Sequence, residues 1–509
     1  MHTPHPSTPR IVISGLSGGA GKSMVSLGLA RALTRRGFRV QTFKKGPDYI
    51  DSAWLALAAR SRQATLDPFF STPKELLAQF ASRCDADICL IEGNRGLFDG
   101  LDAEGSCSTA FLASLLHAPI LLVADCTKMT RTVAALVSGC ATFDPSITIG
   151  GVILNRVGRD RQEQLIRESL KRYCTIPVLG CLPRQAKPLL NERHMGLTCA
   201  AGNARADATL DAIADWAEQH IYMDAVIRLA NESALHSNPA HVPKPDANKA
   251  EAYPLIAPQP APTALGNAQH SPASLTPHPG KPAPRIGYIY DAALWFYYAE
   301  NLDALTAAGA QLVPLSILSK KRWPPIDGLY IGGGLPELHA RKISQNTAIL
   351  SHIRHLSANG LPIYAECGGL MILVSTIRVH KQEYPMTGIF PCTAIFGKHP
   401  KGIGYVEATV ERETPFFPAG LALRGHEFHF SHCEIHPPEK DTPPTLIPPQ
   451  DLAPPALRLS KGFGLGPWPA GAPNMDGLLV NNTYAAYTHL FAPAVPCWAD
   501  RFVSCCRSL

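Results

Sequence analysis

The chain has 509 residues, of which 46% are apolar and 17% are charged, and its formal net charge is +6. This composition excludes a chain that is disordered throughout, and the small net charge gives no support to a nucleic-acid or anionic-membrane partner. No apolar stretch reaches the roughly 18 residues that a membrane-spanning helix needs. Residues 1–10 lack the apolar core of a secretory signal, so we expect a cytoplasmic protein.

Proline is concentrated in two stretches. Of the 46 prolines, 12 lie at 239–284 and 11 at 437–473. Such segments do not bury enough apolar surface to offset the entropy lost on ordering. We therefore expect an interdomain linker at 231–284 and an inserted loop at about 437–473. The 14 cysteines include no C-x-x-C pair, which favours reduced thiols over disulfides or zinc ligands.

From residue 10 to about 230, short apolar strands alternate with longer helical segments. The expected strands are 10–15, 39–46, 86–93, 118–126, 148–157 and 176–183. A helix is expected over 22–36, where apolar residues recur at helical spacing and Gly37 follows as a stop. Buried strands that alternate with helices predict a doubly wound parallel sheet, so we assign residues 1–230 to an α/β domain.

The same alternation resumes after the Pro-rich linker. Strands are expected at 284–290, 311–316, 328–334 and 361–369, with a helix over 302–308. This pattern predicts a second α/β domain over 285–509, which carries the inserted loop.

A glycine-rich turn joins the first strand to the first helix. Its backbone N–H groups and the positive end of the helix would cradle phosphate oxygens. Lys22 would reach the terminal phosphates, and Ser23 would place its hydroxyl on Mg²⁺. The strict G-x4-G-K-[ST] spacing is not met, because Leu16 stands at the first glycine position. We predict an ATP site, not a chance glycine-rich turn, with four glycines in the loop: Gly15, Gly18, Gly19 and Gly21.

Acidic side chains follow the ends of the next two strands. Asp48 and Asp51 follow the second strand, and Glu92 ends the third. Ligands of doubly wound sheets bind beyond the carboxyl ends of the strands, so these carboxylates are candidate Mg²⁺ ligands. The alternative is that Asp48 and Asp51 cap the helix that follows. Asn155, at the end of another strand, is a candidate for recognising adenine.

A candidate nucleophile, Cys367, lies in a strand–turn–helix segment of the second domain. The two glycines after it permit the strained elbow that exposes a nucleophile, and a helix N-terminus stabilises a thiolate. A buried structural thiol would explain the cysteine but not the elbow. His489 is the candidate base, which would activate the thiol and later protonate ammonia. Gly333 and Gly334 are candidates for an oxyanion hole.

Seven motifs together resemble the cobyrinic acid a,c-diamide synthase family. In chain order they are GLSGGAGKS, KKGPDYID, EG..GLFDG at 92–100, GGGLPE, YAECGGLMIL, GHEFHFS at 425–431 and YTHL at 487–490. The resemblance covers nearly all of the chain outside the two Pro-rich stretches. The N-terminal half is similar to dethiobiotin synthetase-type ATPases, which share the longer loop that begins at Gly15. The C-terminal half is similar to class I glutamine amidotransferases.

This resemblance implies a carbon–nitrogen ligase that amidates the a and c acetate side chains of cobyrinic acid, with ATP, Mg²⁺ and glutamine, in cobalamin biosynthesis. Cys367 would attack glutamine with His489 as base, giving a glutamyl thioester and ammonia. ATP would phosphorylate a substrate carboxylate, and ammonia would displace the phosphate. The family positions for metal binding or catalysis fall on Asp48, Asp51 and Glu92. The expected substrate or synthetase site comprises Lys45, Tyr49, Arg95 and His426.

Two departures from the family pattern are visible. Phe491 stands where many class I amidotransferases have a glutamate, two residues after the histidine. Relatives of the cobyrinic type also lack that glutamate, so we expect a Cys–His dyad. Asn94 and Arg95 replace an apolar pair, and we expect Arg95 to contact a substrate carboxylate or phosphate.

Other interpretations stay open at this point. Enzymes that amidate hydrogenobyrinic acid or Ni-sirohydrochlorin share all of these motifs. The KGPDYID and GHEFHFS segments argue against cobyric acid synthase. A ParA-like ATPase fused to a binding domain is the alternative from another class, although such ATPases carry lysine where this loop has Ser17. The sequence also leaves a homodimer open, and we expect neither a nucleic-acid nor a membrane partner.

Overall fold

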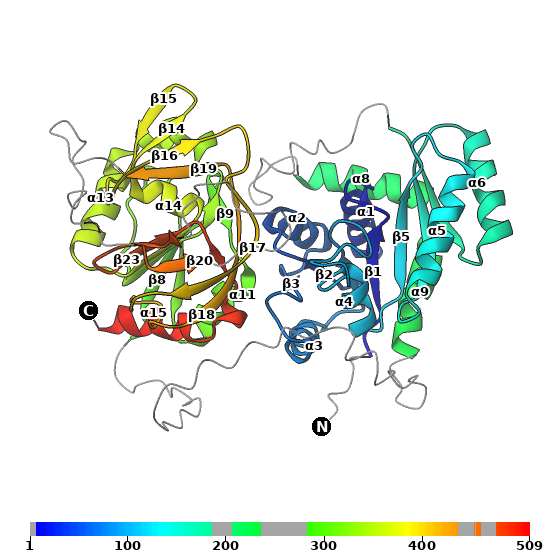
Figure 1. The fold of residues 1–509 in the computed structure, drawn as a ribbon, viewed down its shortest axis with the longest axis horizontal. Coiled ribbons are helices and arrows are strands. Elements are labelled where there is room, and N and C mark those ends of the chain that lie inside the picture. The colour runs from blue at the N-terminus through cyan, green and yellow to red at the C-terminus, as the bar shows by residue number, and fades with distance from the viewer. Residues whose placement is uncertain are drawn as a thin grey trace. The chain divides into compact units, whose positions relative to one another are not determined.

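The computed structural model describes residues 7–185, 206–235, 282–435, 452, 455–459 and 475–508. The chain divides into two compact units, residues 1–255 and 256–509 (Figure 1). The expected linker at 231–284 and the expected inserted loop at 437–473 fall mostly outside the described residues. Within the second range, Leu457–Leu459 forms a strand.

A seven-stranded sheet forms the first unit, in the order β3-β2-β4-β1-β5-β6-β7. All of its strand pairs are parallel, and residues of the central strands such as Val12, Leu90 and Leu122 are fully buried because helices cover both faces. The predicted doubly wound parallel sheet is confirmed. Its strands are β1 (Arg10–Gly15), β2 (Val40–Lys45), β3 (Thr65–Leu66), β4 (Ile88–Glu92), β5 (Ile120–Asp125), β6 (Ile149–Val157) and β7 (Val178–Pro183).

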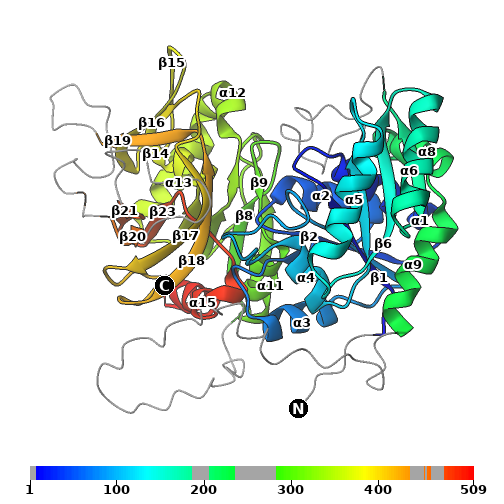
Figure 2. The same cartoon turned by 45° about the vertical axis from the view of Figure 1, so that its right-hand side comes forward.

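The helices of this unit are α1 (Lys22–Arg35), α2 (Tyr49–Ala59), α3 (Pro73–Ser82), α4 (Thr109–Leu115), α5 (Arg131–Phe143), α6 (Asp160–Tyr173), α8 (Ala206–His220) and α9 (Met223–Leu235). Helices α5 and α6 lie side by side in Figures 1 and 2. Helix α1 ends one residue before the predicted end, and Gly37 follows at φ 91. Gly28 of α1 allows α8 to approach closely, since a Cβ there would lie 2.7 Å from Cβ of Ala217.

The second unit is built on a six-stranded sheet in the order β10-β8-β11-β13-β23-β22. Five of these strands run parallel, and β22 pairs antiparallel at the edge. The strands are β8 (Arg285–Ile289), β10 (Gln311–Leu315), β11 (Gly328–Ile331), β13 (Ile363–Glu366), β22 (Leu478–Val480) and β23 (Thr483–Ala486). The helices are α11 (Ala299–Ala307), α12 (Ala340–Ser344), α13 (Thr347–Ala358), α14 (Gly368–Leu373) and α15 (Cys497–Arg507). The predicted second α/β domain is confirmed.

Three further sheets, which the sequence analysis did not predict, complete this unit. A four-stranded sheet contains β14 (Val374–Val379), β15 (Gln382–Pro385), β16 (Phe390–Phe396) and β19 (Ser431–Ile435). A five-stranded sheet contains β17 (Gly402–Val410), β18 (Ala422–His429), β20 (Leu457–Leu459), β21 (Met475–Asp476) and β24 (His489–Leu490). A small pair joins β9 (Leu294–Phe296) to β12 (Gly333–Gly334), and the short 3-10 turns are η2 (Pro336–Leu338) and η4 (Ala492–Ala494).

An aromatic core lies against β13 and β23. Tyr364 and Tyr484 stack with their ring centroids 5.5 Å apart, and Trp498 of α15 lies 5.2 Å from Tyr364. These large buried side chains fix the strand that leads to Cys367. The 13 cysteines within the described ranges carry free thiols. None of the described helices has both the length and the apolar character needed to cross a membrane.

Candidate active sites

The glycine-rich turn after β1 has the backbone shape that a phosphate loop requires. Gly19 has φ 73, and Gly21, the N-cap of α1, has φ 98, a region that residues with a Cβ rarely adopt. A Cβ on Gly15 would lie 2.9 Å from Cβ of Ala20, whereas a Cβ on Gly18 would meet nothing within 4 Å. The loop shape therefore requires glycine at positions 15, 19 and 21, whereas position 18 has room for a side chain.

Asn155 at the end of β6 supports this loop. Its Nδ2 donates a hydrogen bond to the carbonyl oxygen of Ala20 at 2.8 Å, and its Oδ1 accepts one from the N–H of Arg156 at 2.9 Å. A Cβ on Gly21 would clash with Nδ2 of Asn155. The structure thus places Asn155 against the phosphate loop, while its contact with adenine stays a prediction.

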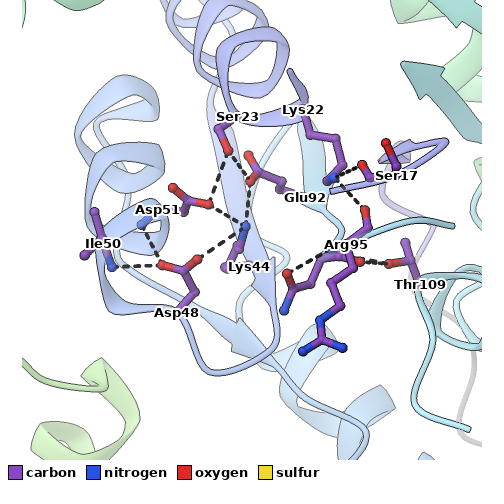
Figure 3. A network of polar contacts seen from close by, with 11 residues as sticks. Ser17, Lys22, Ser23, Lys44, Asp48, Ile50, Asp51, Glu92, Arg95 and Thr109 are labelled. Carbon is purple, nitrogen blue, oxygen red and sulfur yellow. Dashed lines mark hydrogen bonds and ion pairs between the residues drawn. The ribbon is translucent and has the colours of Figure 1, made fainter. Parts of the chain in front are cut away.

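Lys22 links the phosphate loop to the segment after β4. Its Nζ donates to the carbonyl oxygens of Ser17 at 3.1 Å and of Arg95 at 2.5 Å (Figure 3). Burial lowers the pKa of Lys22, and Glu92 partly opposes that effect. Arg95 itself is exposed, and its guanidinium points away from Lys22 (Figure 3). Arg95 is therefore free to meet a ligand while its backbone holds the lysine.

A buried lysine that the sequence analysis missed lies among the predicted acidic residues. Nζ of Lys44 is 2.7 Å from Oδ2 of Asp51, 2.6 Å from Oε1 of Glu92 and 3.8 Å from Oδ2 of Asp48 (Figure 3). Oγ of Ser23 lies 3.2 Å from the same oxygen of Asp51 and 3.0 Å from that of Glu92. The structure therefore brings together all four predicted metal-site residues around one ammonium group.

Burial and neighbouring charges both shift the pKa values of the groups in this cluster. Burial alone would lower the pKa of Lys44, but Asp51 and Glu92 raise it well above its ordinary value. Burial would raise the pKa of Asp51, and the adjacent Lys44 outweighs burial and lowers it. Burial raises the pKa of Glu92, and burial together with Asp51 raises that of Asp48 to about 7. Lys44 and Asp51 thus form the firmly charged pair of the cluster.

The helix-cap interpretation holds for one of the two aspartates. Oδ1 of Asp48 accepts hydrogen bonds from the N–H groups of Ile50 at 3.1 Å and Asp51 at 2.9 Å, so Asp48 is the N-cap of α2. Asp51 lies in the first turn of α2, and its carboxylate faces Lys44 and Ser23 instead (Figure 3). Asp48 both caps the helix and borders the cluster.

Two further predicted residues, Lys45 and Tyr49, adjoin this cluster in the chain. Successive residues of a strand point to opposite faces, which directs Lys45 away from Lys44. Lys45 is buried, and burial lowers its pKa while Asp67 opposes that effect. Tyr49 is buried at the start of α2. The KKGPDYID motif contained the signal for Lys44, but the sequence does not say which of two adjacent lysines faces the carboxylates.

The donors around Lys44 suit Mg²⁺. Ser23, Asp51 and Glu92 present one hydroxyl and two carboxylates, the hard oxygen donors that Mg²⁺ prefers. Within the described ranges, no group of three or more His, Cys, Asp or Glu side chains forms a protein-only metal cage. Mg²⁺ commonly binds to one or two carboxylates together with phosphate and water oxygens, so the donor set fits that ion.

Cys367 occupies the strained elbow between β13 and α14 that its sequence context predicts. Its backbone has φ 48 and ψ −101, and its N–H donates to the carbonyl oxygen of Ala486 at 2.7 Å. A Cβ on Gly368 would lie 2.8 Å from the nitrogen of Gly334. Burial raises the pKa of the Cys367 thiol, and Glu337 adds to the effect. The resting group is therefore a thiol, which needs a base.

His489 lies between Glu366 and the glycine strand β12. Its side chain is only 2% exposed, and Nδ1 is 3.6 Å from Oε2 of Glu366, the residue before Cys367. A Cβ on Gly333 would lie 2.5 Å from Cε1 and 3.4 Å from Nε2 of the imidazole. The predicted base and the predicted oxyanion glycines thus adjoin the nucleophile elbow.

His426 lies against the predicted base. It is directly opposite His489 in the pairing of β18 with β24, and the two imidazole rings stack with centroids 4.8 Å apart. Nδ1 of His426 is 3.4 Å from the hydroxyl of Tyr298. Burial, with a further contribution from His489, lowers the pKa of His426 well below its ordinary value. The structure places this predicted substrate-site residue, as a neutral ring, in the second unit beside His489.

Two further acidic residues near this site were missed. Oδ1 of Asp476 accepts from the N–H of Tyr487 at 3.0 Å, and Oδ2 accepts from the N–H and the hydroxyl of Thr488, both at 2.8 Å, so Asp476 orders the chain before His489. Burial raises the pKa of Glu337 to about 7. Glu337 stands in the GGGLPE motif, but nothing in the sequence marks Asp476.

Two family models match the chain. A CobQ/CobB/MinD/ParA nucleotide binding domain matches residues 11–196, and a CobB/CobQ-like glutamine amidotransferase domain matches residues 285–494. Curated relatives named cobyrinate a,c-diamide synthase match most of the chain. The protein of Magnetococcus marinus is 38% identical over 96% of this chain and 96% of its own. The protein of Syntrophotalea carbinolica is 35% identical over 98% of this chain and 99% of its own. The protein of Listeria innocua is 35% identical over 84% of this chain and 87% of its own.

Proposed function

This chain belongs to the cobyrinate a,c-diamide synthase family, and from that premise we propose that it amidates the a and c acetate side chains of cobyrinic acid with ATP and glutamine. One observation carries the proposal: a phosphate loop and a strained nucleophile elbow occur in a chain that matches a synthase over 96% of its length. We assign ATP-dependent synthesis to residues 1–230 and ammonia production to residues 285–509, joined by the predicted linker at 231–284, whose first five residues continue helix α9.

In the second unit, Cys367 is the proposed nucleophile and His489 its base. Sγ forms a bond to the side-chain carbonyl carbon of glutamine, while the thiol proton passes to the imidazole. The imidazolium then protonates the departing nitrogen, which leaves as ammonia, and water hydrolyses the thioester to glutamate. We assign the oxyanion to the N–H groups of Gly333 and Gly334. The approach of the Gly334 nitrogen to the elbow supports this assignment.

In the first unit, the phosphate loop and Lys22 are the proposed binding site for the phosphates of ATP. The γ-phosphoryl group is transferred to a substrate carboxylate, and ammonia displaces phosphate from the resulting acyl phosphate. A second round amidates the other acetate. Ser23, Asp51 and Glu92 would hold Mg²⁺, which would neutralise charge on the phosphates. We assign the exposed Arg95 to a carboxylate of the substrate.

Two alternatives differ from this proposal in substrate or in class. Hydrogenobyrinic acid or Ni-sirohydrochlorin would undergo the same chemistry in the same site. Turnover measured in parallel with these two compounds and with cobyrinic acid decides between them, because the highest kcat/KM identifies the tetrapyrrole. A ParA-like ATPase fused to a binding domain is disfavoured, since relatives named as synthases match both halves of the chain.

A cytoplasmic location without nucleic-acid or membrane partners is part of the proposal. ATP and glutamine are available there, and free thiols persist in a reducing compartment. A homodimer stays a prediction, which the oligomeric mass of the purified protein would test.

The substitution Cys367→Ser tests whether the second unit produces the ammonia that the first unit uses for amidation. It is expected to abolish glutamine-dependent amidation and to leave amidation with added ammonium chloride, because only the first half-reaction needs the thiol. Cys505→Ser, in α15, is the matched control and should support both nitrogen sources. Glutamine-dependent turnover by Cys367→Ser at the wild-type rate would overturn the assignment of the nucleophile.

A further inference from the structure

Glu366 lies where a carboxylate partner of His489 would be expected to act. It immediately precedes Cys367 at the end of β13, and its side chain is only 1% exposed. The distance from Oε2 to Nδ1 of His489 is 3.6 Å, while the Nε2 edge of the imidazole is on the side of Gly333. The imidazole therefore has a carboxylate beside Nδ1 and the glycine strand β12 along its Cε1–Nε2 edge.

The hydrogen bonds around Glu366 hold its carboxyl group in place and leave one oxygen able to meet the histidine. Oε1 accepts from the hydroxyl of Tyr364 at 3.2 Å and from the N–H of Leu490 at 3.1 Å. Oε2 accepts from the hydroxyl of Tyr330 at 3.1 Å. Three donors thus hold this buried carboxyl group in one orientation. Since a carboxylate oxygen accepts two hydrogen bonds, Oε2 retains capacity toward Nδ1 of His489.

The bond to Leu490 also fixes the position of the base. Leu490 follows His489 in β24, so the carboxylate that faces the imidazole also holds the next peptide unit. Burial, and next the charge of Glu366, raise the pKa of Tyr330 and Tyr364 well above the ordinary value, so both phenols stay protonated as donors. The carboxylate is thus anchored from β11, β13 and β24.

We propose that Glu366 is the positioning residue for His489, a carboxylate supplied by the residue before the nucleophile in place of the glutamate that Phe491 replaces. The inference rests on the proposed roles of Cys367 and His489. When the thiol proton passes to Nε2, the imidazolium carries a positive charge in a buried site, and the carboxylate at Nδ1 offsets that charge. The proton then leaves with ammonia, and the carboxylate takes no part in the proton transfer.

The variant Glu366→Gln tests this inference because it keeps the shape of the side chain and removes its charge. Glutamine-dependent kcat is expected to fall about 10²-fold with KM for glutamine little changed, and ammonia-dependent turnover is expected to remain. The acidic limb of the glutaminase pH profile should move to lower pH, because the imidazolium loses its counter-charge. A merely structural role would not move that limb.

Other charged and titratable groups near the imidazole also contribute to the measured pH profile. Besides Glu366 they include the neutral His426, which stacks on His489 from β18, and Glu427, whose Oε1 is 3.5 Å from the hydroxyl of Thr488. Glu383→Gln is the matched control, since it removes the charge of a carboxylate in the same unit whose side chain is exposed. Its acidic limb should stay where the wild-type limb lies.

Glu366→Asp provides a second measurement that does not depend on the folding of the glutamine variant. Aspartate keeps the charge at a longer distance, so turnover should lie between the wild type and Glu366→Gln, with the acidic limb near the wild-type position. The inference is overturned if the charge-removing variant matches the wild type, or if the aspartate variant shifts the limb as far as glutamine does. Cys367→Ser separates the two failures. If it is inactive with glutamine while Glu366→Gln is fully active, only the positioning role is wrong.

Discussion

Glu337 provides a test of how strongly the second unit buries an acidic group. Burial raises the pKa of Glu337 to about 7, from an ordinary value of 4.5. A raised pKa means that the folded state prefers the neutral carboxyl, so the stabilising contribution is present below pH 4.5 and is lost as the pH rises through 7. The difference corresponds to about 3 kcal/mol of unfolding free energy. Glu337→Gln should remove this pH dependence.

Thermal unfolding at pH 5 and pH 8 measures the effect. At pH 5 the wild type and Glu337→Gln should have nearly equal Tm values, and at pH 8 the variant should melt about 6–12 °C higher, given the size of the unit. Glu383→Gln is the matched control, because the side chain of Glu383 is 54% exposed. Equal changes in Tm at both pH values, or none, would refute the argument that burial of this carboxyl costs stability.

Two further substitutions test the two half-sites. Gly21→Ala forces alanine to φ 98 and brings a Cβ against Asn155, a conformation that costs about 1–2 kcal/mol, so ATP affinity measured by calorimetry should fall about 10-fold. Wild-type affinity would show that the loop tolerates a side chain. Asp476→Asn removes the charged acceptor of Tyr487 and Thr488 at a cost of about 1–3 kcal/mol. Glutamine-dependent turnover should fall about 10-fold while ammonia-dependent turnover stays; an equal loss of both would contradict a local role.

The first unit followed closely from the sequence because its information is local. The predicted strand 10–15 and the helix begun at Lys22 depend on apolar periodicity and on glycines in one short segment, and the structure has both. Parallel order follows once strands alternate with helices. The choice between Lys44 and Lys45 was different, because it depends on which face of β2 meets Glu92 on the adjacent strand.

The surroundings of His489 could not be predicted for a related reason. The stacking of His426 on His489 depends on the antiparallel pairing of β18 with β24, whose residues are about sixty positions apart in the chain. Likewise, Asp476 of β21 accepts a hydrogen bond from the N–H of Thr488, which lies 12 residues later in the chain. Such pairings are set by packing of whole sheets, and no local pattern of apolar residues specifies them. The motifs marked the chemical groups, and tertiary pairing determined their partners.

Phe491 stands at the sequence position of the usual glutamate, but its surroundings in the fold do not suit a carboxylate. Its side chain is fully buried, and its ring packs edge-to-face against that of Tyr298 with the centroids 5.1 Å apart. A carboxylate placed there would either lose several kcal/mol of hydration or become neutral. Phe491→Glu is therefore expected to lower both Tm and glutamine-dependent kcat, whereas Phe491→Leu keeps the apolar packing and should change kcat much less. A higher glutamine-dependent kcat for Phe491→Glu would mean that a carboxylate reaches His489 from this position, and that Glu366 does not already supply it.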